Sequence, residues 1–210
     1  MSSGRDGDPL QRAFAPLLGL PAWSVQKGHG SFLTMEFGEP HLLTREPTQA
    51  KSRNDRVRAR LGCRIVKPVG EWHLWVYCCC WCVVSKDAQI ASSESSDAEI
   101  HAAANEIDGQ ILVKVKADPD KGTSAFEFDL GASLHTGPWE DDRGVEQWML
   151  YAQRSGQVFS YRGDGHYSWG PDSEKSDEMV WRSLRSGRTP ERDCKRGATT
   201  TDSQPRRSLK

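Results

Sequence analysis

The sequence predicts an α+β protein made of two similar halves, each a helix followed by an antiparallel sheet, with a disordered C-terminal tail. Two segments with apolar residues at helical spacing each precede runs in which apolar and polar residues alternate. The order of these segments repeats along the chain, which suggests an internal duplication. Residues after Trp181 include few apolar side chains, too few to offset the entropy of ordering them.

The first half, residues 1–86, is predicted to begin with a helix at residues 9–18, which Asp8 caps and Pro9 opens. Alternating apolar residues then predict strands. Their expected ranges are 23–27, 31–37, 63–67 and 71–84. A polar loop, residues 44–62, interrupts this series and is basic. Its basic residues are Arg45, Lys51, Arg53, Arg56, Arg58 and Arg60.

The second half, residues 97–171, follows an exposed polar connector at residues 87–96. Ser96 and Glu99 have the spacing of a capping box, so a helix is expected to begin there and to end at Gly109. Four strands should follow. Their expected ranges are 110–117, 125–130, 145–152 and 157–161. Residues 172–210 are assigned to the largely disordered basic tail.

Two pairs of residues mark the proposed duplication. Gly38 and Gly131 each follow an acidic and an apolar residue at the end of a predicted strand, and they lie 93 positions apart. Trp72 and Trp148 each lie in the strand that follows a polar loop. If the halves are copies of one unit, each pair should occupy equivalent places in the fold.

The segment WHLWVYCCCWC, residues 72–82, has three alternative interpretations: a buried strand, a metal site or a redox centre. In a single strand, Cys78, Cys80 and Cys82 share one face and Cys79 points to the other, so neighbouring thiols diverge. A zinc site needs ligands that converge through a turn, and the segment has no turn residue. Free cysteine also packs well as a small apolar residue. The sequence therefore favours a buried central strand.

Charge is distributed unevenly along the chain. Residues 182–210 hold nine basic and three acidic residues, so the remainder carries a net charge of −7. No run of about 18 apolar residues predicts a transmembrane helix. The N-terminal residues lack the apolar stretch of a secretory signal. Four cysteines lie within residues 78–82, unlike the spread spacing of a disulfide framework. We therefore expect a cytoplasmic protein with reduced thiols and no association with membranes.

Short motifs in residues 97–171 resemble a group of bacterial domains of unknown function. They are Ile107-Asp108-Gly109-Gln110-Ile111-Leu112, FEFDLGASL (126–134), EQWMLY (146–151) and RGDGHYSWGP (162–171). Those domains have a helix followed by a small antiparallel sheet, a pattern that immunity-type proteins share. The resemblance implies a fold type and a bacterial origin, and it carries over no catalytic residues.

A protein-binding module is the function that the sequence favours, and the resemblance suggests an immunity or inhibitor protein in a bacterial conflict system. The sequence has no catalytic motif, metal-ligand spacing or glycine-rich phosphate loop, so we expect no catalytic residue, metal ligand or cofactor. Arginine and aromatic side chains are the usual anchors of protein interfaces. The candidate binding residues are Arg53, Arg56, Arg58, Arg60, Trp139, Tyr167 and Trp169.

Two other functions remain open at this stage. The basic loop at 45–60 and the tail could bind nucleic acid through phosphate contacts that salt weakens. An enzyme of unrecognised type would instead have a deep pocket lined by titratable groups. The oligomeric state and the identity of the partner do not follow from the sequence.

Overall fold

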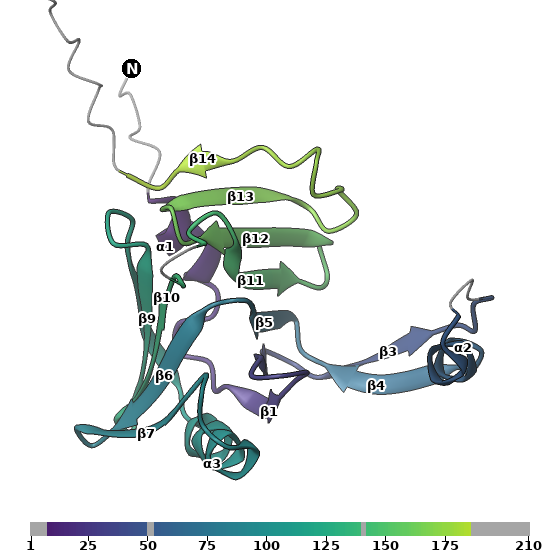
Figure 1. Cartoon of the computed structure of the whole chain (residues 1–210), viewed down its shortest axis with the longest axis horizontal. Coiled ribbons are helices and arrows are strands. Elements are labelled where there is room, and N and C mark those ends of the chain that lie inside the picture. Colours follow the sequence, from purple (N-terminus) through teal and green to yellow (C-terminus); the bar gives the residue numbers. More distant parts are fainter. Residues whose placement is uncertain (1–7, 50–52, 140–141, 186–210) are drawn as a thin grey trace, which may run out of the picture.

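The protein is mostly β, with 46% strand and 14% helix. The computed structural model describes residues 8–49, 53–139 and 142–185 (Figure 1). This part of the chain contains three helices and three antiparallel sheets. The predicted α+β class is therefore wrong. It failed because several segments that the sequence predicts as loops form strands.

Helices are few and short, and strands follow one another along most of the chain. The helices are α1 (Pro9–Phe14), α2 (Asp55–Leu61) and α3 (Asp97–Ile107). The strands are β1 (Trp23–Lys27), β2 (Leu33–Phe37), β3 (His41–Arg45), β4 (Ile65–Val69), β5 (Trp72–Val76), β6 (Cys80–Ser85), β7 (Ala88–Ser92), β8 (Leu112–Asp118), β9 (Thr123–Phe128), β10 (Ala132–Gly137), β11 (Glu146–Ala152), β12 (Gln157–Arg162), β13 (His166–Pro171) and β14 (Arg182–Ser183).

Two large sheets form the body of the molecule. The seven-stranded sheet has the order β1-β2-β5-β11-β12-β13-β14, and the five-stranded sheet has the order β7-β6-β10-β9-β8. The chain passes from the first sheet to the second between β5 and β6, and it returns between β10 and β11. Each sheet therefore contains strands from both predicted halves. The expected arrangement of two separate helix-plus-sheet halves is wrong.

The predicted long strand at 71–84 is two strands in different sheets. Residues 77–79 separate β5, which pairs with β2 and β11, from β6, which pairs with β7 and β10. The buried positions are Leu74 and Val76 before the break, and Trp81 and Val83 after it. The buried residues have even numbers in β5 and odd numbers in β6. Since side chains alternate between the two sides of a strand, the side that faces the core changes between β5 and β6. The predicted faces beyond residue 77 are therefore reversed.

The core lies between the two sheets, with α1 at their junction. Trp148 of β11 is fully buried, and its ring contacts Phe14 of α1 and Phe126 of β9 edge-on at 5.5 and 5.6 Å between ring centroids. It also stacks on Tyr161 of β12 at 5.3 Å. The Trp148 Nε1–H donates to Ser124 Oγ at 3.0 Å, so the one polar atom of the ring is satisfied.

The helices pack on strands near the ends of the sheets. α1 contacts β8, and α3 contacts β1, β7 and β10. The predicted capping box is confirmed: Ser96 Oγ accepts from the Glu99 N–H, and the Glu99 carboxylate accepts from the Ser96 N–H at 2.8 Å. The Asp8 cap of α1 is also confirmed, although α1 ends at Phe14.

The residue pairs that suggested a duplication lie in different surroundings. Gly38 and Gly131 both have a positive φ, but a Cβ at Gly38 would meet Glu71 and Trp72, whereas one at Gly131 would meet nothing within 4 Å. Trp148 is fully buried, while Trp72 only packs on the edge of the core.

Two segments predicted to be irregular take part in the sheets. The expected connector at 87–96 contains β7, which pairs with β6. The segment after residue 172 returns as β14, which pairs with β13. The rest of the predicted tail, residues 186–210, lies outside the described residues. None of the described helices is long and apolar enough to cross a membrane.

Candidate functional site

The outward side of the seven-stranded sheet carries large apolar residues. In β5, Leu74 and Val76 are fully buried against the core, so Trp75 between them points outward. In β11, Trp148 is buried and Met149 points outward, directly across from Trp75 in the register of the two strands. The two central strands of this sheet therefore carry bulky side chains on both faces.

Five half-buried side chains form one cluster on this outward side, and we call it the aromatic face. Its members are Phe32, Trp75, Tyr77, Met149 and Tyr151. The Phe32 and Tyr77 rings lie 4.7 Å apart, the Trp75 and Tyr77 rings 4.8 Å, and the Phe32 and Trp75 rings 6.0 Å. The Tyr151 hydroxyl contacts Met149 Sδ at 3.4 Å.

The main contacts of α1 and α3 are with β1, β7, β8 and β10, and Phe14 of α1 meets β11 on its core side, at Trp148, not on the side of the aromatic face. The five side chains of the aromatic face are each part-exposed. Their partners in β12, Ser160 opposite Met149 and Val158 opposite Tyr151, are buried, so the aromatic face is an apolar surface that the described part of this chain covers in part. Side chains of this kind, aromatic and methionine, are enriched at protein interfaces relative to the rest of the surface. Large exposed apolar patches commonly mark interaction sites.

A carboxylate–histidine pair lies beside the aromatic face. Glu36 Oε1 and His73 Nδ1 are 2.7 Å apart, and Glu36 Oε2 accepts the Gly70 N–H at 3.0 Å. Burial alone would raise the pKa of Glu36, but the hydrogen bond and charge of His73, the Gly70 N–H and the charge of Lys67 together lower it. The His73 ring lies 6.1 Å from that of Tyr151. This pair joins β2 and β5 to the residue that follows β4, so its role in the structure is to hold neighbouring segments together.

Two carboxylates, those of Glu146 and Asp172, act on the tyrosines of the aromatic face. Burial raises the pKa of the Tyr151 hydroxyl, and the charges of Asp172 and Glu146 raise it further. The pKa of Tyr77 is raised first by its hydrogen bond with Cys78, and Glu146 adds to the shift. Glu146 therefore acts on both tyrosines and Asp172 on Tyr151 alone, and this negative charge favours a partner that presents basic residues there.

A separate feature projects from the body, and we call residues 41–69 the arm. It consists of β3, α2 and β4, and Figure 1 shows it extending away from the five-stranded sheet. The predicted polar loop at 44–62 is therefore wrong in part, because it contains the helix α2, which Asn54 caps. The Asn54 Oδ1 accepts from the N–H of Arg56 at 3.0 Å. No residue of α2 is buried.

The candidate arginines all lie on the arm and are exposed. Arg53 precedes α2, and Arg56, Arg58 and Arg60 lie within it. Arg58 forms an ion pair with Asp55 one turn earlier. The arm carries eight basic and two acidic residues, a net charge of +6. Lys51 lies outside the described residues, and the structure places the other charged residues on a projecting element with a short helix.

The three candidate aromatic residues do not lie with these arginines. Tyr167 is buried, and its ring stacks on Phe159 at 5.2 Å, which makes it a core residue. Trp169 is 38% exposed, and the Arg12 guanidinium lies over its ring at 5.2 Å. Trp139 is 39% exposed and forms an isolated bridge with Asp142. β13, which carries two of these residues, lies well away from α2 (Figure 1).

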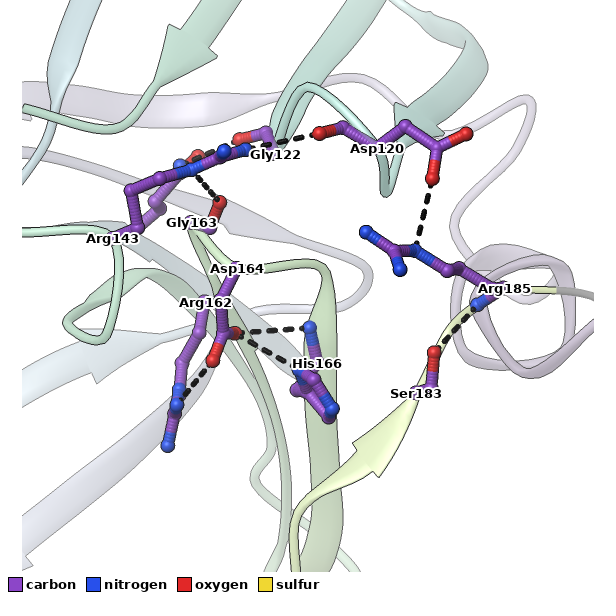
Figure 2. A network of polar contacts seen from close by, with 10 residues as sticks. Asp120, Gly122, Arg143, Arg162, Gly163, Asp164, His166, Ser183 and Arg185 are labelled. Carbon is purple, nitrogen blue, oxygen red and sulfur yellow. Dashed lines mark hydrogen bonds and ion pairs between the residues drawn. The ribbon is translucent and has the colours of Figure 1, made fainter. Parts of the chain in front are cut away.

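A network of polar contacts joins three loops at one end of the body (Figure 2). Arg143 donates to the carbonyl oxygens of Gly163 at 3.2 Å and Asp120 at 3.0 Å, and Arg185 pairs with the Asp120 carboxylate at 2.9 Å. Asp164 binds Arg162 and the N–H of His166 in the next turn. These contacts fix the loops relative to one another, while Arg162 Nε and the neighbouring Tyr161 hydroxyl are buried without a hydrogen-bond partner among the described residues.

The cysteines are distributed differently from the prediction. Cys79, at the crossing between the sheets, is 2% exposed, and burial together with its neighbours Cys80 and Cys78 raises the pKa of its thiol. Cys78, Cys80 and Cys82 are half-buried, and Cys63 on the arm is exposed. Cys194 lies outside the described residues. Within the part that the structure describes, no three potential metal ligands come together.

Comparisons of the chain with protein-family models, curated proteins and solved structures gave no match. The resemblance of residues 97–171 to immunity-type domains thus stays a prediction. The five residues of the aromatic face were not among the sequence candidates. The signal in the sequence was the near-continuous run of large apolar residues in β5 and β11, which places such residues on both faces of each strand.

Proposed function

We propose that this protein is a protein-binding module and that the aromatic face is its docking surface. The observation that carries the proposal is the cluster of part-exposed aromatic and methionine side chains on the outward side of the larger sheet. Such side chains supply large contact areas, and burying them on a partner would release water from apolar surface. The carboxylates of Glu146 and Asp172 favour a partner with basic residues around its contact region.

The resemblance suggests a class of partner. If residues 97–171 belong with the immunity-type domains, the partner is a toxin of a bacterial conflict system and the protein is its immunity or inhibitor protein. Nucleic acid suits the aromatic face poorly, because Glu146 and Asp172 would repel phosphates.

Site-specific photocrosslinking in the native cells tests the proposal. We expect a benzoylphenylalanine placed at position 75 to give a discrete covalent adduct. The same group at position 113 should give none, because Val113 is 48% exposed but lies on β8 of the other sheet. Met149→Asp should reduce the adduct roughly tenfold, the effect of about 1.4 kcal/mol of lost binding energy. Equal adducts at both positions, or none at position 75, would refute the proposal.

A further inference from the structure

The arm has an apolar side that nothing in the described chain covers. In the register of β3 and β4, Leu42 pairs with Pro68 and Thr44 pairs with Val66, and these four residues share one side of the ribbon. All four are exposed, with Leu42 at 71% and Val66 at 54%. None is charged. We call this side the bare side of the arm.

The other side of the ribbon faces α2. Arg45 Nη2 donates to the carbonyl oxygen of Arg60 at 3.2 Å, and the N–H of Thr48 donates to the carbonyl oxygen of Leu61 at 2.8 Å. A two-stranded ribbon is marginally stable in water by itself. α2 meets the ribbon through these two contacts, and Leu43 on the same side is still 41% exposed. A partner on the bare side would therefore add an apolar layer that the ribbon lacks.

The chain itself carries a surface that complements the arm. The arm has a net charge of +6. Outside the arm and residues 182–210, the chain holds 11 basic and 24 acidic residues, a net charge of −13. The aromatic face belongs to this acidic part, and Glu146 and Asp172 lie close enough to raise the pKa of Tyr151. An apolar surface with acidic surroundings thus matches an apolar ribbon flanked by arginines.

The arm cannot meet this face within one molecule as the structure shows it, because the arm extends away from the body (Figure 1). Two molecules can make the contact reciprocally about a two-fold axis, the commonest symmetry of homo-oligomers. We propose that the arm of one copy docks its bare side on the aromatic face of a second copy. This inference rests on the proposed function of the aromatic face and names a second copy of this chain as its partner.

Sedimentation velocity of the full-length protein tests the contact. We expect a reversible dimer that forms between about 1 and 200 µM and that weakens when salt screens the charges. Val66→Asp on the bare side should raise the dimer Kd at least roughly tenfold. Val113→Asp, the same change at an exposed valine of β8, should leave the dimer Kd unchanged. A second variant, R56E with R60E, changes only the charge of α2 and should weaken the dimer without touching the ribbon.

A mixing experiment distinguishes this specific contact from non-specific association. Val66→Asp weakens the arm and Met149→Asp weakens the face, so each variant alone should dimerise at least roughly tenfold more weakly than the wild type. Their mixture retains one intact arm–face pair and should form a heterodimer. A wild-type chain that stays monomeric, a Val66→Asp dimer as strong as wild type, or a mixture that stays monomeric would overturn the proposal. A species that nuclease removes would also overturn it, since nucleic acid would then be the occupant.

The photocrosslinking experiment keeps the two proposals distinguishable. An adduct at position 75 with twice the chain mass of 23.5 kDa is the second copy that we expect. An adduct of another mass from a chain that is monomeric in sedimentation would overturn the self-association and leave the binding function standing. If no adduct forms at position 75, both proposals are overturned.

Discussion

Replacing Trp148 with alanine is expected to lower the free energy of unfolding by about 3–5 kcal/mol, the range found when large buried aromatic residues are truncated. Trp148 is fully buried, stacks on Tyr161 and Phe159, and meets Phe126 from the other sheet. The substitution would leave a cavity where the two sheets meet. It would also leave the Ser124 hydroxyl without the Trp148 donor. Urea unfolding, followed as a shift in midpoint at constant slope, measures the loss.

Trp75 is the matched control for this substitution. It is a tryptophan of the neighbouring strand in the same sheet, but it lies on the outward side and is half-exposed. We expect Trp75→Ala to cost about 1 kcal/mol or less, because surface substitutions usually have small effects. Equal losses for the two variants would mean that the outward side is part of the stabilising core, which contradicts its assignment as a docking surface.

Gly122→Ala is expected to destabilise the protein by about 3 kcal/mol or more, because two separate costs add. Gly122 has a φ of +72°, a conformation that strains any residue with a Cβ. An alanine Cβ there would also overlap the carbonyl oxygen of Gly163, on the neighbouring loop. That loop cannot easily withdraw, because Gly163 packs against Pro138 and its oxygen accepts from Arg143.

Gly131→Ala separates the two costs. Gly131 has a φ of +98°, but a Cβ there would meet no atom within 4 Å. The variant should therefore show only the backbone strain, about 1 kcal/mol, or about 2–4 °C in Tm for a chain of this size. The drop for Gly122→Ala should be roughly three times larger. If the two variants melt together, the loops around Gly122 and Gly163 do not pack as the structure has them.

Local signals in the sequence predicted individual elements well. The capping box at Ser96 and Glu99 depends on residues three positions apart, and α3 begins there as expected. The strand that was expected at 145–152 is β11 at Glu146–Ala152, because its unbroken apolar and aromatic run from Trp148 is typical of a strand with bulky side chains on both faces. In the basic loop, the signal for α2 was Asn54 as a cap, but the density of arginines suggested a solvated loop.

Signals that depend on distant parts of the chain could not be read from the sequence. The change of face at residues 77–79 arises because β5 and β6 pair with strands of different sheets. β10 looked like a polar loop, yet Leu134 and Thr136 are buried within the five-stranded sheet. The candidate site likewise has one part that local sequence predicts and one part that depends on distant strands. The exposure of Arg53 and the other candidate arginines follows from their charge, but the aromatic face depends on which side of β5 and β11 the core covers.

Carbene footprinting is the most direct test of the claim that the aromatic face is a docking surface. The labelling of Trp75, Tyr77 and Tyr151 is compared between dilute purified protein and protein in its native cells. Val113 and Leu130, which are 48% and 68% exposed on other strands and turns, serve as references. We predict that labelling of the three aromatic residues falls several-fold in cells while the references stay constant, because a bound partner excludes the reagent. Unchanged labelling of Trp75, Tyr77 and Tyr151 in cells would contradict the account.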